Sequence, residues 1–234
     1  MGTWTDSSGE QPVRLPLGDV ELEGDLTLPE NARGLVLFAH GSGSSRKSPR
    51  NRYVASMIRK AGVGTLLFDL LSPSEGDSDA VDAHLRFDIR FLAERLVGAT
   101  DWAVAHPLTR SLRLGYFGSS TGAAAALVAA TERPGVVGAV VSRGGRPDLA
   151  GAALAHVRAP TLFIVGGADD VVLELNELAL RKMRAPKTDL IVIPGASHLF
   201  PEPGALEEVA RLASTWFGHF LGGVGVEVTP AHPL

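Results

Sequence analysis

A serine lies at the centre of a short turn, Gly118-Ser119-Ser120-Thr121-Gly122, between an apolar run (112–117) and an alanine-rich segment (123–130). A strand that turns sharply into a helix with Gly-x-Ser-x-Gly at the corner is typical of a nucleophile elbow, where a tight backbone turn exposes the central hydroxyl. The spacing predicts that Ser120, rather than Ser119, is a nucleophile. A corner built from small residues for packing alone would carry the same pattern, so the rest of the chain must decide.

A serine hydroxyl needs a base that takes its proton and an acid that orients the base. Chains with this elbow carry these partners in the order serine, acid, histidine. Asp169 and His198 each follow an apolar run downstream of Ser120, which matches that order. Asp170 offers a second carboxylate. Because the later aspartate is the more natural helix cap, we expect Asp169 to orient His198 and Asp170 to cap the next helix.

The oxyanion of an acyl-transfer intermediate needs N–H donors that are already in place. The residue after the nucleophile, Thr121, supplies one backbone N–H, and we value it for that group rather than for its side chain. The loop that begins at His40 follows a buried apolar run and supplies the second donor. Ser42 is the expected donor and Gly43 the alternative, since neighbouring glycine lets the backbone approach a substrate closely.

Strands and helices that alternate along the chain must bring these residues together. Continuous apolar runs at 34–39, 65–71, 112–117, 136–141, 160–165 and 189–193 predict strands buried on both faces, as in a parallel sheet. Residues 13–17 and 20–28, separated by Gly18-Asp19, predict a hairpin at the sheet edge. The expected fold is α/β, with a central, mostly parallel sheet and helices on both faces.

The segments between the strands carry helical spacing or turn signals. Residues 85–105 and 171–183 have helical periodicity. Residues 72–82 are rich in acidic and turn-forming residues and predict a loop, either a solvated surface loop or a mobile rim over the site. Ligands of open α/β sheets bind at the carboxyl ends of the strands, and Ser120, Asp169, His198 and the His40 loop all follow predicted strands.

Composition limits the classes of function. The chain has 234 residues, of which 45% are hydrophobic and 21% charged, and its formal net charge is −4. These values favour one globular domain, expected at 12–222 with loose tails at 1–11 and 223–234, and they argue against binding to nucleic acid. The sequence has no cysteine, no signal-peptide pattern and no apolar run long enough to span a membrane. A cytoplasmic protein without membrane contact is expected, and its oligomeric state is left open.

Five motifs in this order, strand-HGSG, strand-FDL, GSSTG, GGADDVV and GASH, resemble the α/β-hydrolase superfamily over roughly residues 20–220, and in brevity its dienelactone hydrolase branch. The resemblance implies an α/β-hydrolase fold with Asp169 and His198 as acid and base. Dienelactone hydrolases proper carry a cysteine nucleophile, whereas position 120 is serine, which favours serine esterase chemistry over lactonase specificity. The superfamily often inserts a lid before the acid. Only residues 143–159 occupy that interval, so an open site without a large lid is expected.

The sequence therefore predicts a serine hydrolase that cleaves a carboxylic ester of a small molecule, with no cofactor and no metal; thioesters, lactones and amides stay open as substrates. A non-catalytic binding protein on the same fold is the first alternative. A nucleotide-binding protein is a weaker one, because the stretch Gly41–Arg46, with Asp69 after the next strand, only partly matches a dinucleotide-binding fingerprint. Arg143 and Arg146 follow a strand near the site and are expected to bind either a substrate carboxylate or neighbouring loop groups.

Overall fold

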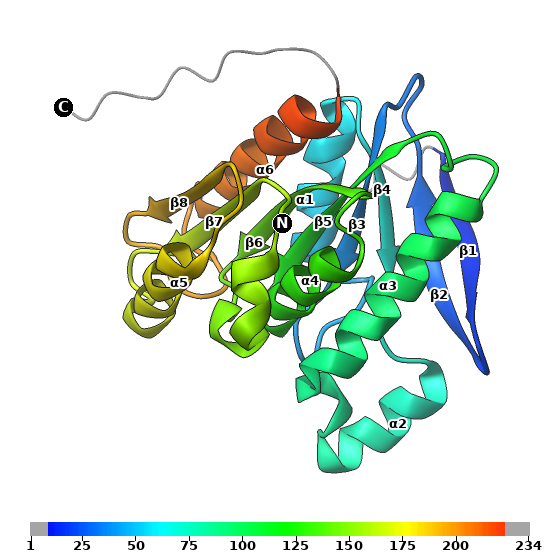
Figure 1. Ribbon diagram of the computed structural model, residues 1–234, viewed down its shortest axis with the longest axis horizontal. Helices are drawn as coiled ribbons and strands as arrows, with labels where there is room; N and C mark the ends of the chain where they lie inside the picture. Colours follow the sequence, from blue (N-terminus) through cyan, green and yellow to red (C-terminus); the bar gives the residue numbers. More distant parts are fainter. Residues whose placement is uncertain (1–8, 223–234) are drawn as a thin grey trace.

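One twisted eight-stranded sheet runs through the computed structural model, which describes residues 9–222 (Figure 1). The strands lie in the order β1-β2-β4-β3-β5-β6-β7-β8. β2 pairs antiparallel with β1 and with β4, and every other neighbouring pair is parallel. The strand bounds are β1 (Glu10–Leu17), β2 (Val20–Thr27), β3 (Gly34–Ala39), β4 (Gly64–Phe68), β5 (Arg113–Ser119), β6 (Val137–Arg143), β7 (Thr161–Gly166) and β8 (Thr188–Ile193).

Helices cover both faces of this sheet, as Figure 1 shows. α1 and α6 pack against each other on one face, and α3 and α4 on the other. The helices are α1 (Pro49–Lys60), α2 (Pro73–Asp82), α3 (Ile89–Ala105), α4 (Thr121–Glu132), α5 (Asp170–Lys182) and α6 (Ala205–Leu221), with 3-10 segments η1 (Leu85–Phe87) and η2 (Pro147–His156). The predicted α/β-hydrolase fold, with its mostly parallel sheet and no large lid, is confirmed: η2 is the one helical segment between β6 and β7, and β7 leads to Asp169.

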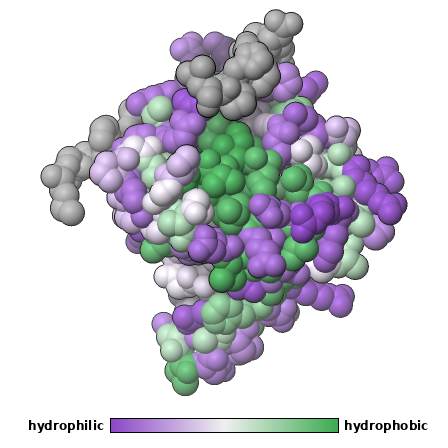
Figure 2. Space-filling view, turned by 90° about the vertical axis from the view of Figure 1, so that its left-hand side faces the viewer, coloured by the Kyte–Doolittle hydropathy of each residue, from purple (hydrophilic) through white to green (hydrophobic). Residues whose placement is uncertain are grey.

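Burial explains why the central strands are continuous apolar runs in the sequence. All residues of β3, β4 and β7 are buried, because helices cover both faces of the sheet there. β8 is one of the two edge strands of the sheet, and Val192 within it is 39% exposed. Figure 2 views the side of the molecule on which β8 and α5 lie, and apolar surface gathers in the middle of that face.

Three expectations differ from the structure. The acidic segment 72–82 is not a loop but the helix α2, which starts with a capping box: Ser72 Oγ accepts the Glu75 N–H and the Glu75 carboxylate accepts the Ser72 N–H. Residues 85–105 form η1 and α3 rather than one helix, since Asp88 caps α3 by accepting the Phe91 N–H. β1 begins at Glu10, two residues before the expected domain start at 12. The remaining tail residues, 1–8 and 223–234, lie outside the described part of the chain.

The sequence predicts no segment that is long and apolar enough to span a membrane. Between residues 9 and 222, no helix is both long and apolar enough to cross a bilayer.

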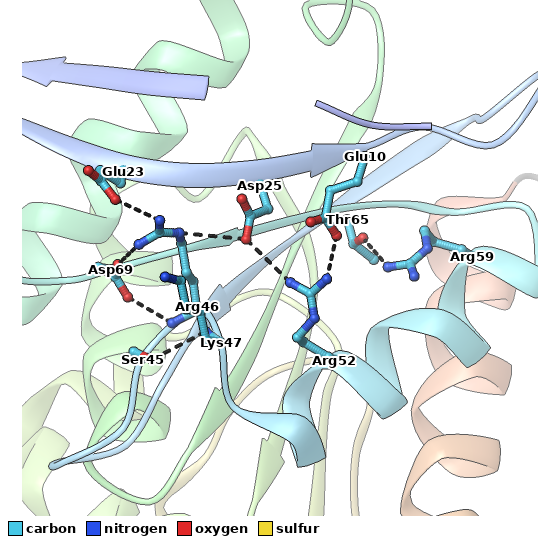
Figure 3. Close-up of polar contacts among 10 residues, drawn as sticks. All are labelled: Glu10, Glu23, Asp25, Ser45, Arg46, Lys47, Arg52, Arg59, Thr65 and Asp69. Atoms are coloured by element: carbon cyan, nitrogen blue, oxygen red, sulfur yellow. Dashed lines mark hydrogen bonds and ion pairs between the residues drawn. The ribbon is translucent and has the colours of Figure 1, made fainter. Parts of the chain in front are cut away.

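A chain of ion pairs fastens the loop after β3 to the antiparallel edge of the sheet (Figure 3). Arg46, in this loop, donates its backbone N–H to Asp69 Oδ1 over 2.7 Å and pairs its guanidinium with Asp69 Oδ2. The same guanidinium contacts Glu23 at 2.6 Å and Asp25 at 3.6 Å. Burial and the nearby charge of Glu10 raise the pKa of Asp25. Asp69 is therefore occupied by Arg46, which argues against its predicted alternative role as a ribose-binding acid.

We expect Asp69→Ala to lower the free energy of unfolding by about 1–3 kcal/mol, because it removes the partner of two partly buried donors of Arg46. Glu23→Ala is the matched control: its side chain is 51% exposed, so its loss should cost less than about 1 kcal/mol. Urea unfolding of both variants measures the difference. Equal effects would show that the loop is not held mainly through Asp69.

Candidate active site

The backbone at Ser120 is held in a conformation that L-residues rarely adopt. Ser120 joins β5 to α4 with φ 52° and ψ −122°. Such a conformation costs on the order of 1–3 kcal/mol and persists only where the surrounding structure enforces it. The sharp turn gives Ser120 partial exposure, while Ser119 is only 2% exposed. The expectation that Ser120 is the accessible serine of the pair therefore agrees with the geometry.

Close backbone contacts explain both glycines of the turn. A Cβ on Gly118 would lie 2.4 Å from Ala123 Cα, and a Cβ on Gly122 would lie 2.2 Å from the Ala39 carbonyl oxygen. Neither position can hold a larger residue without moving backbone. The Gly-x-Ser-x-Gly pattern is thus required by the approach of α4 to β5 and β3, and the fully buried alanines 123–126 allow the same close packing along the helix.

The main chain of Ser120 is hydrogen-bonded to residues at and after the end of β6, and its side chain does not cap α4. Its N–H donates to the Arg143 carbonyl over 3.3 Å, and its carbonyl accepts from Arg146 N at 3.2 Å. Serine at a helix N-cap usually accepts a backbone N–H through its hydroxyl, but the Ser120 side chain makes no such bond. The hydroxyl is consequently available for chemistry.

His198 and Asp169 meet at the carboxyl ends of β8 and β7. His198 Nδ1 lies 2.7 Å from Asp169 Oδ2, and the two side chains are 38% and 17% exposed. With the Nδ1 hydrogen donated to the carboxylate, the Nε2 of a neutral imidazole is left with a lone pair that can accept a proton. This is the arrangement of a general base held in one tautomer by an acid.

The two aspartates occupy positions at the start of α5 that differ from the predicted ones. Asp169, not Asp170, occupies the N-cap position of α5, and it makes no side-chain capping bond because its carboxylate contacts His198. Asp170 is the first residue inside the helix. The expected capping role of Asp170 is therefore wrong, while Asp169 is the aspartate that contacts the histidine.

Gly144 links the histidine to the elbow. This glycine has φ 50°, and a Cβ there would lie 3.1 Å from the His198 carbonyl oxygen and 3.6 Å from its Cε1. The preceding residue, Arg143, accepts the Ser120 N–H. The His198 ring and Ser120 are thus both packed around the corner that follows β6, so the structure brings the three predicted catalytic residues to one edge of the sheet.

The loop after β3 lies directly against the elbow. A Cβ on Gly41 would be 3.1 Å from Ser120 Cβ, so only glycine lets the loop come this close. The Ser42 N–H, the expected second oxyanion donor, donates to Thr121 Oγ1 over 2.9 Å. Thr121 is 4% exposed. Its side chain, which we had valued less than its backbone N–H, is therefore the group that engages Ser42.

His40 has a structural place at the start of this loop. Its Nε2 accepts the Leu70 N–H at 3.1 Å, and its Nδ1 lies 3.0 Å from the Gly41 carbonyl oxygen. Burial lowers the pKa of His40, which favours the neutral ring that these two contacts require. The imidazole joins the segment after β3 to the segment after β4.

The two arginines after β6 differ in their partners. Arg146 forms two hydrogen bonds with Asp148, at 2.9 and 2.8 Å, and is accounted for by this pair. Arg143 is 6% exposed, and its Nε and Nη1 have no hydrogen-bond partner among residues 9–222. Burial, followed by the charge of Arg50, lowers the pKa of Arg143 to about 10, so the side chain stays protonated at neutral pH. Its guanidinium carbon lies 6.0 Å from the centre of the Phe200 ring.

Two positioning contacts were not predicted. Asn176 of α5 is fully buried and donates through Nδ2 to the carbonyls of Gly145 and Val172, at 3.0 and 2.7 Å, which fastens the loop after β6. Ser197 Oγ donates to Glu202 over 2.6 Å beside His198. The sequence carried a signal for Asn176, a polar residue on the buried face of an amphipathic helix, but none that separates Ser197 from an ordinary turn serine.

Solved structures and curated proteins include relatives of this chain. A crystal structure of a dienelactone hydrolase from Anabaena variabilis is 60% identical, has a TM-score of 0.89, and the match covers 91% of this chain and 98% of that one. The Pyrococcus furiosus esterase Pf2001 is 19% identical with a TM-score of 0.76, over 94% of this chain and 98% of that chain, and shares the fold.

A curated relative from Mycobacterium tuberculosis is named a putative phosphoribosyl transferase. It is 56% identical over 216 residues, which are 92% of this chain and 48% of the relative. The chain therefore spans about half the length of that protein. The model of the dienelactone hydrolase family matches residues 30–219. This match extends from before β3 to near the end of α6 and includes every residue of the site, and the chain accordingly belongs to the dienelactone hydrolase family.

Proposed function

We propose that this member of a hydrolase family is a serine esterase that cleaves the carboxylic ester of a small molecule through an acyl-enzyme. The observation that carries the proposal is the hydrogen bond between His198 Nδ1 and Asp169, formed at the edge where the strained turn presents Ser120. Esterases among the structural neighbours add support for the class of reaction.

In the acylation step, Ser120 Oγ attacks the ester carbonyl carbon while His198 Nε2 takes the hydroxyl proton. The tetrahedral intermediate then expels the alcohol, which receives that proton from His198. Asp169 holds the imidazole in place and stabilises the imidazolium. In the second half, His198 activates a water molecule that attacks the acyl-enzyme and releases the acid and free Ser120.

The oxyanion hole in this proposal uses Thr121 and Ser42. The Thr121 backbone N–H is one donor. Because the Ser42 N–H donates to Thr121 Oγ1, its influence on an oxyanion passes through that hydroxyl, which accepts from Ser42 and donates its own hydrogen onward. Such a relay holds the donors in place before negative charge develops on the carbonyl oxygen, which is the requirement for stabilising the transition state.

The alternatives have less support. A nucleotide-binding role would require Asp69, which is already paired with Arg46. The name of the M. tuberculosis relative describes a protein about twice as long, so that name does not assign a transferase activity to this chain. A non-catalytic binding protein would have no need of an aligned His198–Asp169 pair beside a strained serine. Cytoplasmic location and the absence of nucleic-acid and membrane partners stay predictions.

Ser120→Ala should lower kcat/KM for p-nitrophenyl acetate by about 10⁴-fold or more, because it removes the attacking oxygen. Ser119→Ala, a change at the buried neighbour, is the matched control and should retain most activity. A fluorophosphonate probe should label the parent protein once and fail to label the Ser120 variant. Equal hydrolysis rates for the parent protein and Ser120→Ala would overturn the mechanism.

Asp169→Asn should lower kcat by about 10³- to 10⁴-fold, since an amide no longer fixes the required tautomer of His198. Asp170→Asn places the same change one residue later, where the side chain does not contact His198, and should cost less than about tenfold. Steady-state kinetics on the same ester compare the two. The reverse ranking would assign the acid to Asp170.

Thr121→Val keeps the shape of the side chain but removes the hydroxyl, and should lower kcat by about 10- to 100-fold with little change in KM. Thr121→Ser retains a hydroxyl and should keep most of the rate. Circular dichroism checks that both variants fold. If Thr121→Val instead raised kcat, the hydroxyl would be blocking the Ser42 N–H rather than relaying its effect.

A further inference from the structure

A pocket of about 180 Å³ opens beside the elbow, on the side of the loop after β3. Gly41, Ser42 and Thr121 form the wall nearest the elbow, and the opposite wall comes from α2 and the segments around it. We call it the α2 pocket. Its other lining residues include Leu70, Leu71, Leu92, Gly76, Asp79 and Arg86.

The direction of the proposed reaction assigns this pocket to one half of the ester. His198 must give its proton to the leaving alcohol oxygen, so the alcohol lies on the His198 side of Ser120. Neither His198 nor Asp169 lines the α2 pocket, whereas both proposed oxyanion residues do. From this geometry we infer that the α2 pocket receives the acyl group, and that this group is short and uncharged. The inference rests on the proposed function.

Volume limits the length of the acyl group. At about 180 Å³, the α2 pocket is smaller than most small-molecule sites, which measure about 300–1,000 Å³. Beyond Leu71 and Gly76 lies a second hollow that shares these residues and is also lined by Glu23, Arg46 and Asp69. Figure 3 shows that these three side chains belong to the ion-pair chain. A longer alkyl chain would therefore extend from the apolar side chains of the α2 pocket to the charged side chains of the second hollow.

The charged residues of the α2 pocket are already paired with each other. Asp79 is 2% exposed; its Oδ2 accepts from Arg86 Nε at 2.5 Å, and its Oδ1 accepts the N–H groups of Leu85 and Arg86 at 2.8 and 3.1 Å. Arg86 also donates to the Asp79 carbonyl at 2.6 Å. Because Arg86 is engaged in this way, the pocket offers no free cation for a charged acyl group, and a neutral one fits it better.

α2 is a fixed wall rather than a mobile one. Its first turn is held by the Ser72–Glu75 capping box, and Glu75 also pairs with Arg95 of α3. Asp79 ties the end of α2 to the start of η1 through Leu85 and Arg86. In Figure 1, α2 lies below the N-terminal end of α3. The volume of the pocket is therefore set by the side chains of α2 and their neighbours.

Gly76 is the residue of α2 that sets this volume. Glycine is unfavourable within a helix, and nothing in the backbone requires it here: a Cβ at this position would meet no atom within 4 Å. Its effect on the α2 pocket is to leave space. A larger side chain at position 76 would enter that space without displacing backbone, which makes Gly76 a determinant of acyl-chain length.

The test measures kcat/KM for p-nitrophenyl acetate, butyrate and octanoate. The parent protein should prefer butyrate over octanoate by at least about tenfold. Gly76→Leu should lower the butyrate-to-acetate ratio by about tenfold or more while retaining acetate hydrolysis, since one or two methylenes in a filled pocket change rates by about 10- to 200-fold. Gly76→Ala should raise Tm through its helix propensity and change the ratio little.

Ala80→Leu is the matched control, because it adds the same side chain to an exposed position of the same helix. Its butyrate-to-acetate ratio should equal that of the parent protein. An unchanged ratio in a folded Gly76→Leu, or octanoate cleaved as well as butyrate by the parent, would overturn the acyl-pocket assignment. Failure of the proposed function has a different signature, namely that Ser120→Ala cleaves all three esters as fast as the parent.

Discussion

The positive φ of Ser120 is the constraint on which the rest of the site depends. A non-glycine residue holds that conformation only if its neighbours leave no alternative, and here they are the two glycines of the turn, the alanines of α4 and the backbone groups of Arg143 and Arg146. The same hydrogen bonds fix the loop after β6 against the elbow. Since His198 packs on Gly144 in that loop, one strained residue and its support also locate the base.

A second set of contacts positions the oxyanion side of the site from the opposite half of the sheet. His40 bridges the segments after β3 and β4, while Arg46 binds Asp69 and the acids of β2. These contacts hold the loop in the position where Gly41 lies against Ser120. The antiparallel hairpin at the sheet edge thus has a role in the site, because its carboxylates neutralise the arginine that anchors the loop.

The sequence predicted the order of strands and helices and the His198–Asp169 contact, because buried parallel strands leave long apolar runs and the polar residues after them converge at one edge. It failed where local composition was ambiguous. Residues 72–82 look like a loop since acidic and small residues dominate, yet the Ser72–Glu75 capping box starts a helix there. The choice of Asp170 as cap was wrong because α5 begins at position 170, one residue before the predicted start, which leaves Asp169 at the N-cap. The contact between Ser42 and Thr121, 79 positions apart, leaves no local signal.

Three residues of the candidate active site and the α2 pocket are unfavourable for stability, each for a different physical reason. Ser120 has a strained backbone, Gly76 weakens the helix that contains it, and Arg143 is a buried guanidinium with two unpaired nitrogens. In the capped helices and the buried strands, by contrast, local preference and fold agree. Ser120 and Arg143 lie where β5 and β6 end, and Gly76 lines the α2 pocket. Unfavourable residues at such positions are expected of a functional site, since selection for stability alone would have replaced them. Arg143 lies next to the elbow, because it pairs with Ser119 in the register of β5 and β6, so a buried charge and a strained backbone stand side by side there.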